Sequence, residues 1–127
     1  MAIHKGDGWA VANIDDLGDG PGFRKIRREL DVSEMGVNAI IQPVGVQPNF
    51  HFHERQEEVY FVHQGAVEIE FRDGAKHRLE AGGLARVAAA TQRKVTAVGD
   101  QDAVYVVFGA EGGYVGRDGQ DGGGGAG

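Results

Sequence analysis

The chain has 127 residues, enough for one domain with its own hydrophobic core, and its lack of cysteine excludes disulfide bridges and zinc–thiolate sites. Nineteen acidic and 13 basic residues give a net charge of −6 and a pI near 5.3, which argues against a nucleic-acid-binding surface. No apolar run approaches the roughly 18 residues of a membrane span, and residues 1–7 lack the apolar core of a signal peptide, so we expect a cytoplasmic protein without membrane contact.

The N-terminal part combines a short apolar stretch with a basic segment. Residues 9–14 are mostly apolar, and we expect Trp9 to cover the rest of the domain or a partner subunit. A turn-rich loop follows up to residue 22. Residues 23–30 then read as either a helix or a strand with an exposed basic face. In an acidic protein this basic face is typical of a solvated surface, so it is given no functional role.

The middle of the chain is rich in β-forming residues. Short apolar runs, several of them alternating, are separated by turn signals such as Gln64-Gly65 and Asp73-Gly74. A spacing of about eight residues between such runs is typical of an all-β sandwich or barrel. The expected strands cover residues 37–44, 58–63, 66–71, 76–79, 84–88, 94–98 and 103–109.

The C-terminal end differs in composition from the rest. Ten of the 22 glycines fall in residues 109–127, and residues 119–127 have almost nothing to bury. We therefore expect one domain over residues 1–110 and a glycine-rich tail over residues 111–127 that is disordered at its end.

The most informative pattern lies in residues 45–65. Gly45 is followed after five residues by His51-Phe52-His53, then after four residues by Glu58, and after six more by Gly65. In an extended chain, residues two apart project to the same side, so His51 and His53 can share one target. If the chain folds back after Glu54, Glu58 joins them. Two imidazoles and a carboxylate with open positions suit a divalent first-row metal.

This spacing resembles the first motif of the cupin superfamily. The resemblance implies an all-β, double-stranded β-helix (jelly-roll) barrel in which His51, His53 and Glu58 face inward and hold a divalent metal, with Fe, Mn, Zn and Ni not distinguished. It favours a strand over residues 23–30, and it implies a homodimer. By alternation, Tyr60 shares the face of Glu58 and is either a residue of the pocket or ordinary core packing.

The second cupin motif is degenerate. Its first glycine is present as Gly82, but counting onward places Ala88 at the proline, Ala90 at the glycine, Arg93 at the histidine and Ala97 at the asparagine. The histidine of this motif supplies the fourth metal ligand in cupins, so that ligand is absent here.

Arg93 therefore has three possible arrangements, which the sequence leaves open. It pairs with Glu58 in place of a metal site, it binds the carboxylate or phosphate of a substrate, or it turns to solvent and leaves a three-ligand site. Glu57 is an alternative ligand to Glu58, but only Glu58 keeps six residues before Gly65.

The other histidines are assigned no role. His63 has the opposite parity to Glu58, His77 lies between two basic residues after a turn, and His4 lies near the N-terminus.

The sequence is compatible with two functions. The first is a metal-dependent oxygenase, isomerase or lyase acting on a small organic molecule, with Glu58 and Tyr60 as candidate catalytic residues and Tyr60 and Arg93 as substrate-binding residues. The second is a metal-free, non-catalytic module that binds or senses a small anionic molecule through Arg93. The motif does not decide between them, because one fold hosts many functions.

Overall fold

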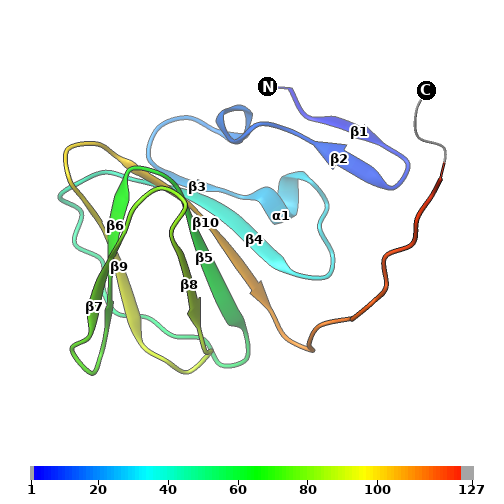
Figure 1. Cartoon of the computed structure of the whole chain (residues 1–127). Helices are drawn as coiled ribbons and strands as arrows, with labels where there is room; N and C mark the ends of the chain where they lie inside the picture. Colours follow the sequence, from blue (N-terminus) through cyan, green and yellow to red (C-terminus); the bar gives the residue numbers. More distant parts are fainter. Residues whose placement is uncertain (1, 124–127) are drawn as a thin grey trace.

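The computed structural model describes residues 2–123 and consists almost entirely of antiparallel strands (Figure 1). The expectation of disorder falls on the end of residues 119–127, of which residues 124–127 lie outside the described residues. Residues 111–123 contain no helix or strand. None of the helices in residues 2–123 is long and apolar enough to cross a membrane. The elements are β1 (His4–Gly6), β2 (Trp9–Val11), a 3-10 turn η1 (Ile14–Leu17), β3 (Gly22–Arg24), α1 (Ile26–Glu29), β4 (Gly36–Gln42), β5 (Glu57–Gln64), β6 (Ala66–Phe71), β7 (Lys76–Leu79), β8 (Leu84–Val87), β9 (Arg93–Val98) and β10 (Ala103–Ala110).

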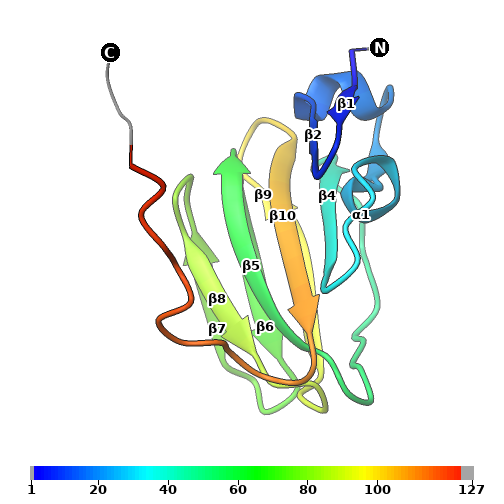
Figure 2. The ribbon, with the colours of Figure 1, turned by 90° about the vertical axis from the view of Figure 1, so that its right-hand side faces the viewer.

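Two sheets form the body of the domain. One has the strand order β3-β4-β10-β5-β8 and the other β7-β6-β9, and the two sheets face each other in Figures 1 and 2. β1 and β2 form a separate hairpin at one end. The core between the sheets includes Val62, Val67, Ile69 and Val87, all at most 2% exposed. The predicted all-β jelly roll is confirmed.

Alternation along the strands decides which side chains enter the interior. In β5, Glu58, Tyr60 and Val62 are buried, whereas Glu57 and Val59 are exposed. Successive side chains of a strand point to opposite faces of the sheet, so the buried set is the one that faces the second sheet. The strand thereby carries a carboxylate, Glu58, and a phenol, Tyr60, into the largely apolar interior.

Gly65 makes the tight turn between β5 and β6. Its φ is +74°, and a Cβ at this position would lie 2.7 Å from the carbonyl oxygen of Asp102. Glycine is required here because the left-handed conformation and the close approach both disfavour any side chain.

Two expectations for the N-terminal part need correction. The predicted strand over residues 23–30 ends at Arg24, after which Ile26–Glu29 form one helical turn. The propensity of this segment for helix outweighs the strand pattern once β3 has paired with β4. Trp9 does not bury itself on the barrel: it is 57% exposed and its ring lies against Gly6 of the same hairpin.

Candidate metal centre and adjoining cavity

The two motif histidines lie on the loop between β4 and β5, outside the regular strands. His51 forms an isolated β-bridge with Arg93, in which His51 N donates to Arg93 O at 2.9 Å and Arg93 N donates to His51 O at 3.0 Å. His53 N donates to Ala89 O at 2.8 Å. These bonds fix the loop to the start of β9 and to the turn before it, so both imidazoles project from a loop that is held in place by backbone hydrogen bonds.

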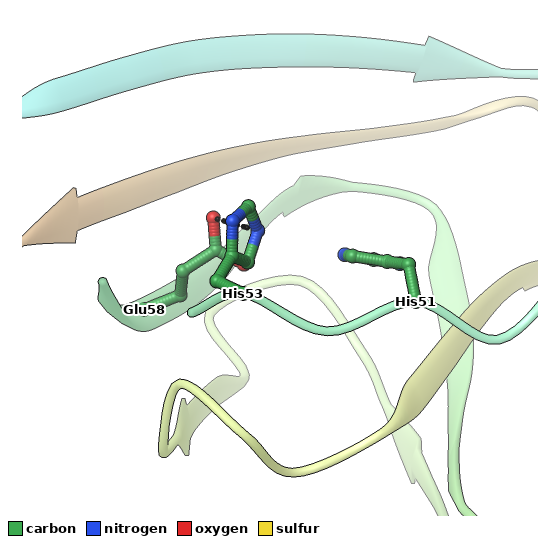
Figure 3. A group of neighbouring side chains, drawn as sticks. All are labelled: His51, His53 and Glu58. Atoms are coloured by element: carbon green, nitrogen blue, oxygen red, sulfur yellow. Dashed lines mark ion pairs between the residues drawn. The ribbon is translucent and has the colours of Figure 1, made fainter. Parts of the chain in front are cut away.

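The imidazoles converge with Glu58, as predicted. His51, His53 and Glu58 each offer one ligand atom, and these atoms lie within 4.8 Å of one another. His53 Nε2 is 3.2 Å from Glu58 Oε2, and the ring of His51 points toward this pair from the same loop (Figure 3). The two rings meet edge to face with centroids 5.6 Å apart. The structure thus joins residues of a loop and of β5 into one cluster.

Arg93 points into the barrel and forms an ion pair with Glu58. Its Nη2 donates to Glu58 Oε1 at 2.6 Å, and its Nε donates to the hydroxyl oxygen of Tyr60 at 3.1 Å. That hydroxyl donates in turn to Glu58 Oε1 at 2.8 Å. Of the interactions considered for Arg93 from the sequence, the structure has the ion pair with Glu58, which uses Oε1 and leaves Glu58 Oε2 beside His53.

The remaining donors of Arg93 are also used within the protein. Nη1 donates to the carbonyl oxygens of Ala88, Ala89 and Thr91 at 3.3, 3.2 and 2.7 Å. The residue is 0% exposed. Each guanidinium nitrogen therefore has a protein partner, and an anionic ligand would have to displace Glu58 to reach it.

Burial and the Arg93 charge set the protonation of the cluster. Burial lowers the pKa of His51, and the neighbouring Arg93 cation lowers it further, against the opposing effect of Glu58. Burial raises the pKa of Tyr60 well above its usual value, although the hydrogen bond from Arg93 acts in the opposite direction. Burial alone would lower the pKa of Arg93, but its hydrogen bonds to Tyr60 and Glu58 outweigh this and raise it. At neutral pH, His51 is therefore a neutral imidazole and Tyr60 a neutral hydroxyl.

A cavity of about 400 Å³ adjoins the cluster. Its wall is formed by the cluster together with apolar and amide side chains from β3, β4, β9 and β10. The lining residues are Phe23, Asn38, Ile40, Gln42, Pro48, Asn49, His51, His53, Glu58, Tyr60, Val95, Tyr105 and Val107. Arg93 is not among them, because Tyr60 and Glu58 stand between its guanidinium and the open space.

Sequence reasoning missed four polar residues of this wall: Asn38, Gln42, Asn49 and Tyr105. The Tyr105 hydroxyl donates to Gln42 Oε1 at 2.9 Å, and Gln42 Nε2 donates to Val95 O at 3.2 Å. Burial raises the pKa of Tyr105 to about 12. The sequence contained an indication of the two amides. Asn38 and Gln42 lie four residues apart in an apolar β run, so their side chains face the same side of the strand.

The other candidates lie away from the cluster. Glu57, the alternative ligand, is exposed and pairs with Arg86 at 2.6 Å. His63 and His77 are exposed on β5 and β7, and His4 is exposed in β1. The choice of Glu58 over Glu57 from the motif spacing agrees with this geometry.

The donor set fits a divalent first-row metal. Two imidazole nitrogens and a carboxylate oxygen are the ligands such ions take. Glu58 binds Arg93 and Tyr60 through Oε1, while its Oε2 faces the histidines. A carboxylate whose second oxygen is fixed by hydrogen bonds is typical of metal sites, in which outer partners orient the ligands. The three residues are therefore positioned to hold a metal.

Comparisons with known proteins agree with this fold. The chain is similar to a crystal structure of a cupin protein from Bacteroides fragilis, with 26% identity, a TM-score of 0.69, and coverage of 81% of this chain and 89% of that one. A search of curated proteins found no match.

Two further structures, both below 25% identity, are alike in fold. One is a sugar phosphate isomerase from a cupin superfamily of Silicibacter pomeroyi, with 21% identity, a TM-score of 0.63, and coverage of 84% of this chain and 61% of that one. The other is a predicted oxalate decarboxylase from Thermotoga maritima, with 17% identity, a TM-score of 0.55, and coverage of 60% and 65%. The family model described as "Cupin domain" matches residues 38–109, more than half of the 127 residues. The chain belongs to the cupin family.

Proposed function

We propose that this cupin binds a divalent metal through His51, His53 and Glu58 and acts on a small organic molecule held in the adjoining cavity. The observation that carries the proposal is the convergence of three ligand atoms within 4.8 Å at the wall of a cavity of about 400 Å³. Largely apolar cavities with a few convergent polar groups are the usual sites of small ligands. The proposed enzyme class is an oxygenase, an isomerase or a lyase.

Each residue of the cluster has a defined part in this proposal. His51 and His53 are nitrogen ligands, and Glu58 is the oxygen ligand through Oε2. A bound metal would polarise a substrate oxygen or activate water or oxygen. The hydroxyl of Tyr60 lines the cavity and donates to Glu58 Oε1, so it orients the carboxylate. Arg93 holds the same oxygen from behind and keeps Glu58 in one rotamer.

The test is the metal content of untagged protein purified without added metal. We expect close to one divalent ion per chain by inductively coupled plasma mass spectrometry, and its loss in His51→Ala and in His53→Ala. His77→Ala is the matched control, because His77 is exposed on β7 and outside the cluster. Metal that is far below one per chain, or that persists without both motif histidines, would refute the proposal.

A metal-free binding module is the second candidate, and the Arg93–Glu58 ion pair favours it. The pair places a permanent cation beside the carboxylate, where a metal would otherwise supply the positive charge. On this alternative, a small organic anion displaces Glu58 from Arg93 and raises the melting temperature of protein treated with EDTA, and Arg93→Ala abolishes the rise. A ligand response that needs added metal and survives Arg93→Ala would count against it.

We also propose that the protein is a cytoplasmic homodimer. Large apolar side chains are exposed on the outer face of the five-stranded sheet, where Val59 and Phe108 pair across β5 and β10 and Leu84 lies on β8. Exposed apolar patches of this kind are common at protein interfaces. Sedimentation velocity should give a mass twice the 13.5 kDa of one chain. The Phe108→Glu variant should have a measured mass closer to that of the monomer.

A further inference from the structure

A basic groove lies beside the cavity and has no part in the metal cluster. It is lined by Phe23, Lys25, Arg27, Arg28 and Asn38. Phe23 and Asn38 also line the cavity, so the two spaces share a wall. The groove and the cavity are therefore neighbours, with Phe23 and Asn38 in contact with both.

The local fold explains how the basic side chains gather there. β3 pairs with β4 so that Phe23 lies opposite Ile40, and both side chains line the cavity. Arg24 alternates to the other side and is buried, with its Nη2 donating to Gly20 O at 2.8 Å. The helical turn of α1 then replaces the expected strand, next to β3 and β4 in Figure 1. A strand would have placed Arg27 and Arg28 on opposite faces, whereas this turn brings both into one groove.

The charges of the groove are largely uncompensated. No acidic residue lines it, and over residues 2–123 neither Lys25 nor Arg27 forms an ion pair. Arg28 pairs only with its neighbour Glu29, at 3.0 Å, and such an exposed pair contributes little. Three cations in one groove of a chain with net charge −6 repel one another, and an anion relieves that repulsion.

Arg93 does not offer an equivalent anion site, since all its nitrogens are occupied within the protein. The side chains of Lys25 and Arg27 are exposed and carry no such partners. Any anionic group that enters with a ligand of the cavity meets the groove without having to break an existing ion pair.

We propose that the ligand of this cupin is an organic anion whose apolar body occupies the cavity and whose phosphate or carboxylate binds Lys25, Arg27 and Arg28. The inference deepens the proposed function, since it names the substrate class of the same cavity. Phe23, which is 61% exposed, lies between the two spaces and packs on the body of the ligand. Phosphate and carboxylate oxygens are the groups that arginine side chains bind best.

The experiment uses the full chain after EDTA treatment, so that no result depends on a metal. Phenyl phosphate, phenylacetate, benzyl alcohol and inorganic phosphate are titrated by isothermal calorimetry at 50 mM NaCl. We expect the two organic anions to bind at least about tenfold more tightly than benzyl alcohol or inorganic phosphate. We also expect K25Q/R27Q to weaken both organic anions by about tenfold without changing the melting temperature.

The control is K76Q/R78Q, which removes the same two charges from exposed positions on β7. The inference would be overturned if the control lost as much affinity as K25Q/R27Q, or if K25Q/R27Q kept its affinity. It would also be overturned if benzyl alcohol bound as tightly as the organic anions, or if neither anion bound. Inorganic phosphate binding as tightly as phenyl phosphate would also overturn it, because the cavity would then contribute nothing. Failure of the metal-content test leaves these outcomes unaffected, so the two proposals fail separately.

Discussion

The buried ion pair between Arg93 and Glu58 gives the sharpest prediction about stability. Arg93→Met removes a cation that is 0% exposed and leaves the Glu58 carboxylate, 10% exposed, without a charge partner. Removing one member of a buried pair costs about 3–5 kcal/mol, because the other charge stays desolvated. Three backbone carbonyl oxygens also lose their donor. We expect a loss of about 4 kcal/mol in the free energy of unfolding of the metal-free protein.

That loss is large enough to measure by thermal unfolding. The unfolding entropy is about 2.1 cal/mol/K per residue, or roughly 0.27 kcal/mol/K for 127 residues, so the melting temperature should fall by about 15 °C. Circular dichroism is the appropriate probe, because the one tryptophan, Trp9, is 57% exposed in a hairpin apart from the core. Arg78→Met is the matched control: Arg78 pairs with Glu80 at 2.8 Å, but both are exposed, so it should change stability by less than about 1 kcal/mol.

A second variant separates the charge from simple loss of packing. Glu58→Gln in the Arg93→Met background removes the unpaired charge and leaves an amide that still bonds to Tyr60, so it should restore about 2 kcal/mol. If Arg93→Met costs less than about 1 kcal/mol, or if the two substitutions are additive, the carboxylate does not depend on the guanidinium and the reasoning is wrong.

The remaining predictions concern the cavity wall and the turns. The pKa of Tyr105 is raised to about 12 from an unfolded value near 10, so it contributes about 2.7 kcal/mol of stability that is complete below pH 10 and is lost as the pH rises toward 12. In an alkaline titration at 295 nm, Tyr105→Phe should remove a component with a midpoint near 12; a midpoint near 10 would show that the hydroxyl is not buried. Gly65→Ala should cost about 2–3 kcal/mol in urea unfolding, because its Cβ meets Asp102 O at 2.7 Å, whereas Gly74→Ala, with φ +98° and nothing within 4 Å, should cost only about 1 kcal/mol. Equal costs at the two glycines would contradict the steric argument.

The group of candidate metal ligands could be predicted from the sequence because its three residues lie close together along the chain. His51, His53 and Glu58 lie within eight residues, and strand alternation decides their faces once a turn is placed between them. The direction of Arg93 could not be predicted in this way. Counting along the second motif put it at the histidine position, but all three side-chain arrangements were compatible with the sequence. The choice depends on Tyr60 and three carbonyl oxygens that only the tertiary structure brings together.

The cavity wall and the groove depend on strand order, which the sequence does not contain. β10 lies between β4 and β5, and its Val107 is opposite both Asn38 and Tyr60, so these three residues from distant segments form one row of the wall. The basic groove depends on β3 ending at Arg24. This boundary could not be predicted, because the helix and strand propensities of residues 23–30 differ too little to locate it. The acidic composition of the chain favours a solvated face for the basic side chains of residues 23–30, and it does not reveal that three of them gather in one groove.

The position of Arg93 also relates the two candidate functions, because the guanidinium and a metal would both neutralise the charge of one carboxylate, the guanidinium at Oε1 and the metal at Oε2. The charges of Glu58 and Arg93 cancel, so a divalent ion would bring the sum of these three charges to +2, compared with +1 if the arginine were absent. Like charges close together in a buried site repel strongly, so Arg93 should weaken metal binding. The same Arg93→Met variant that is unstable without metal should then bind Mn²⁺ more tightly than wild type and regain more of its melting temperature when Mn²⁺ is added. If Mn²⁺ instead binds more weakly to the variant, Arg93 supports the metal ligands rather than repelling the metal.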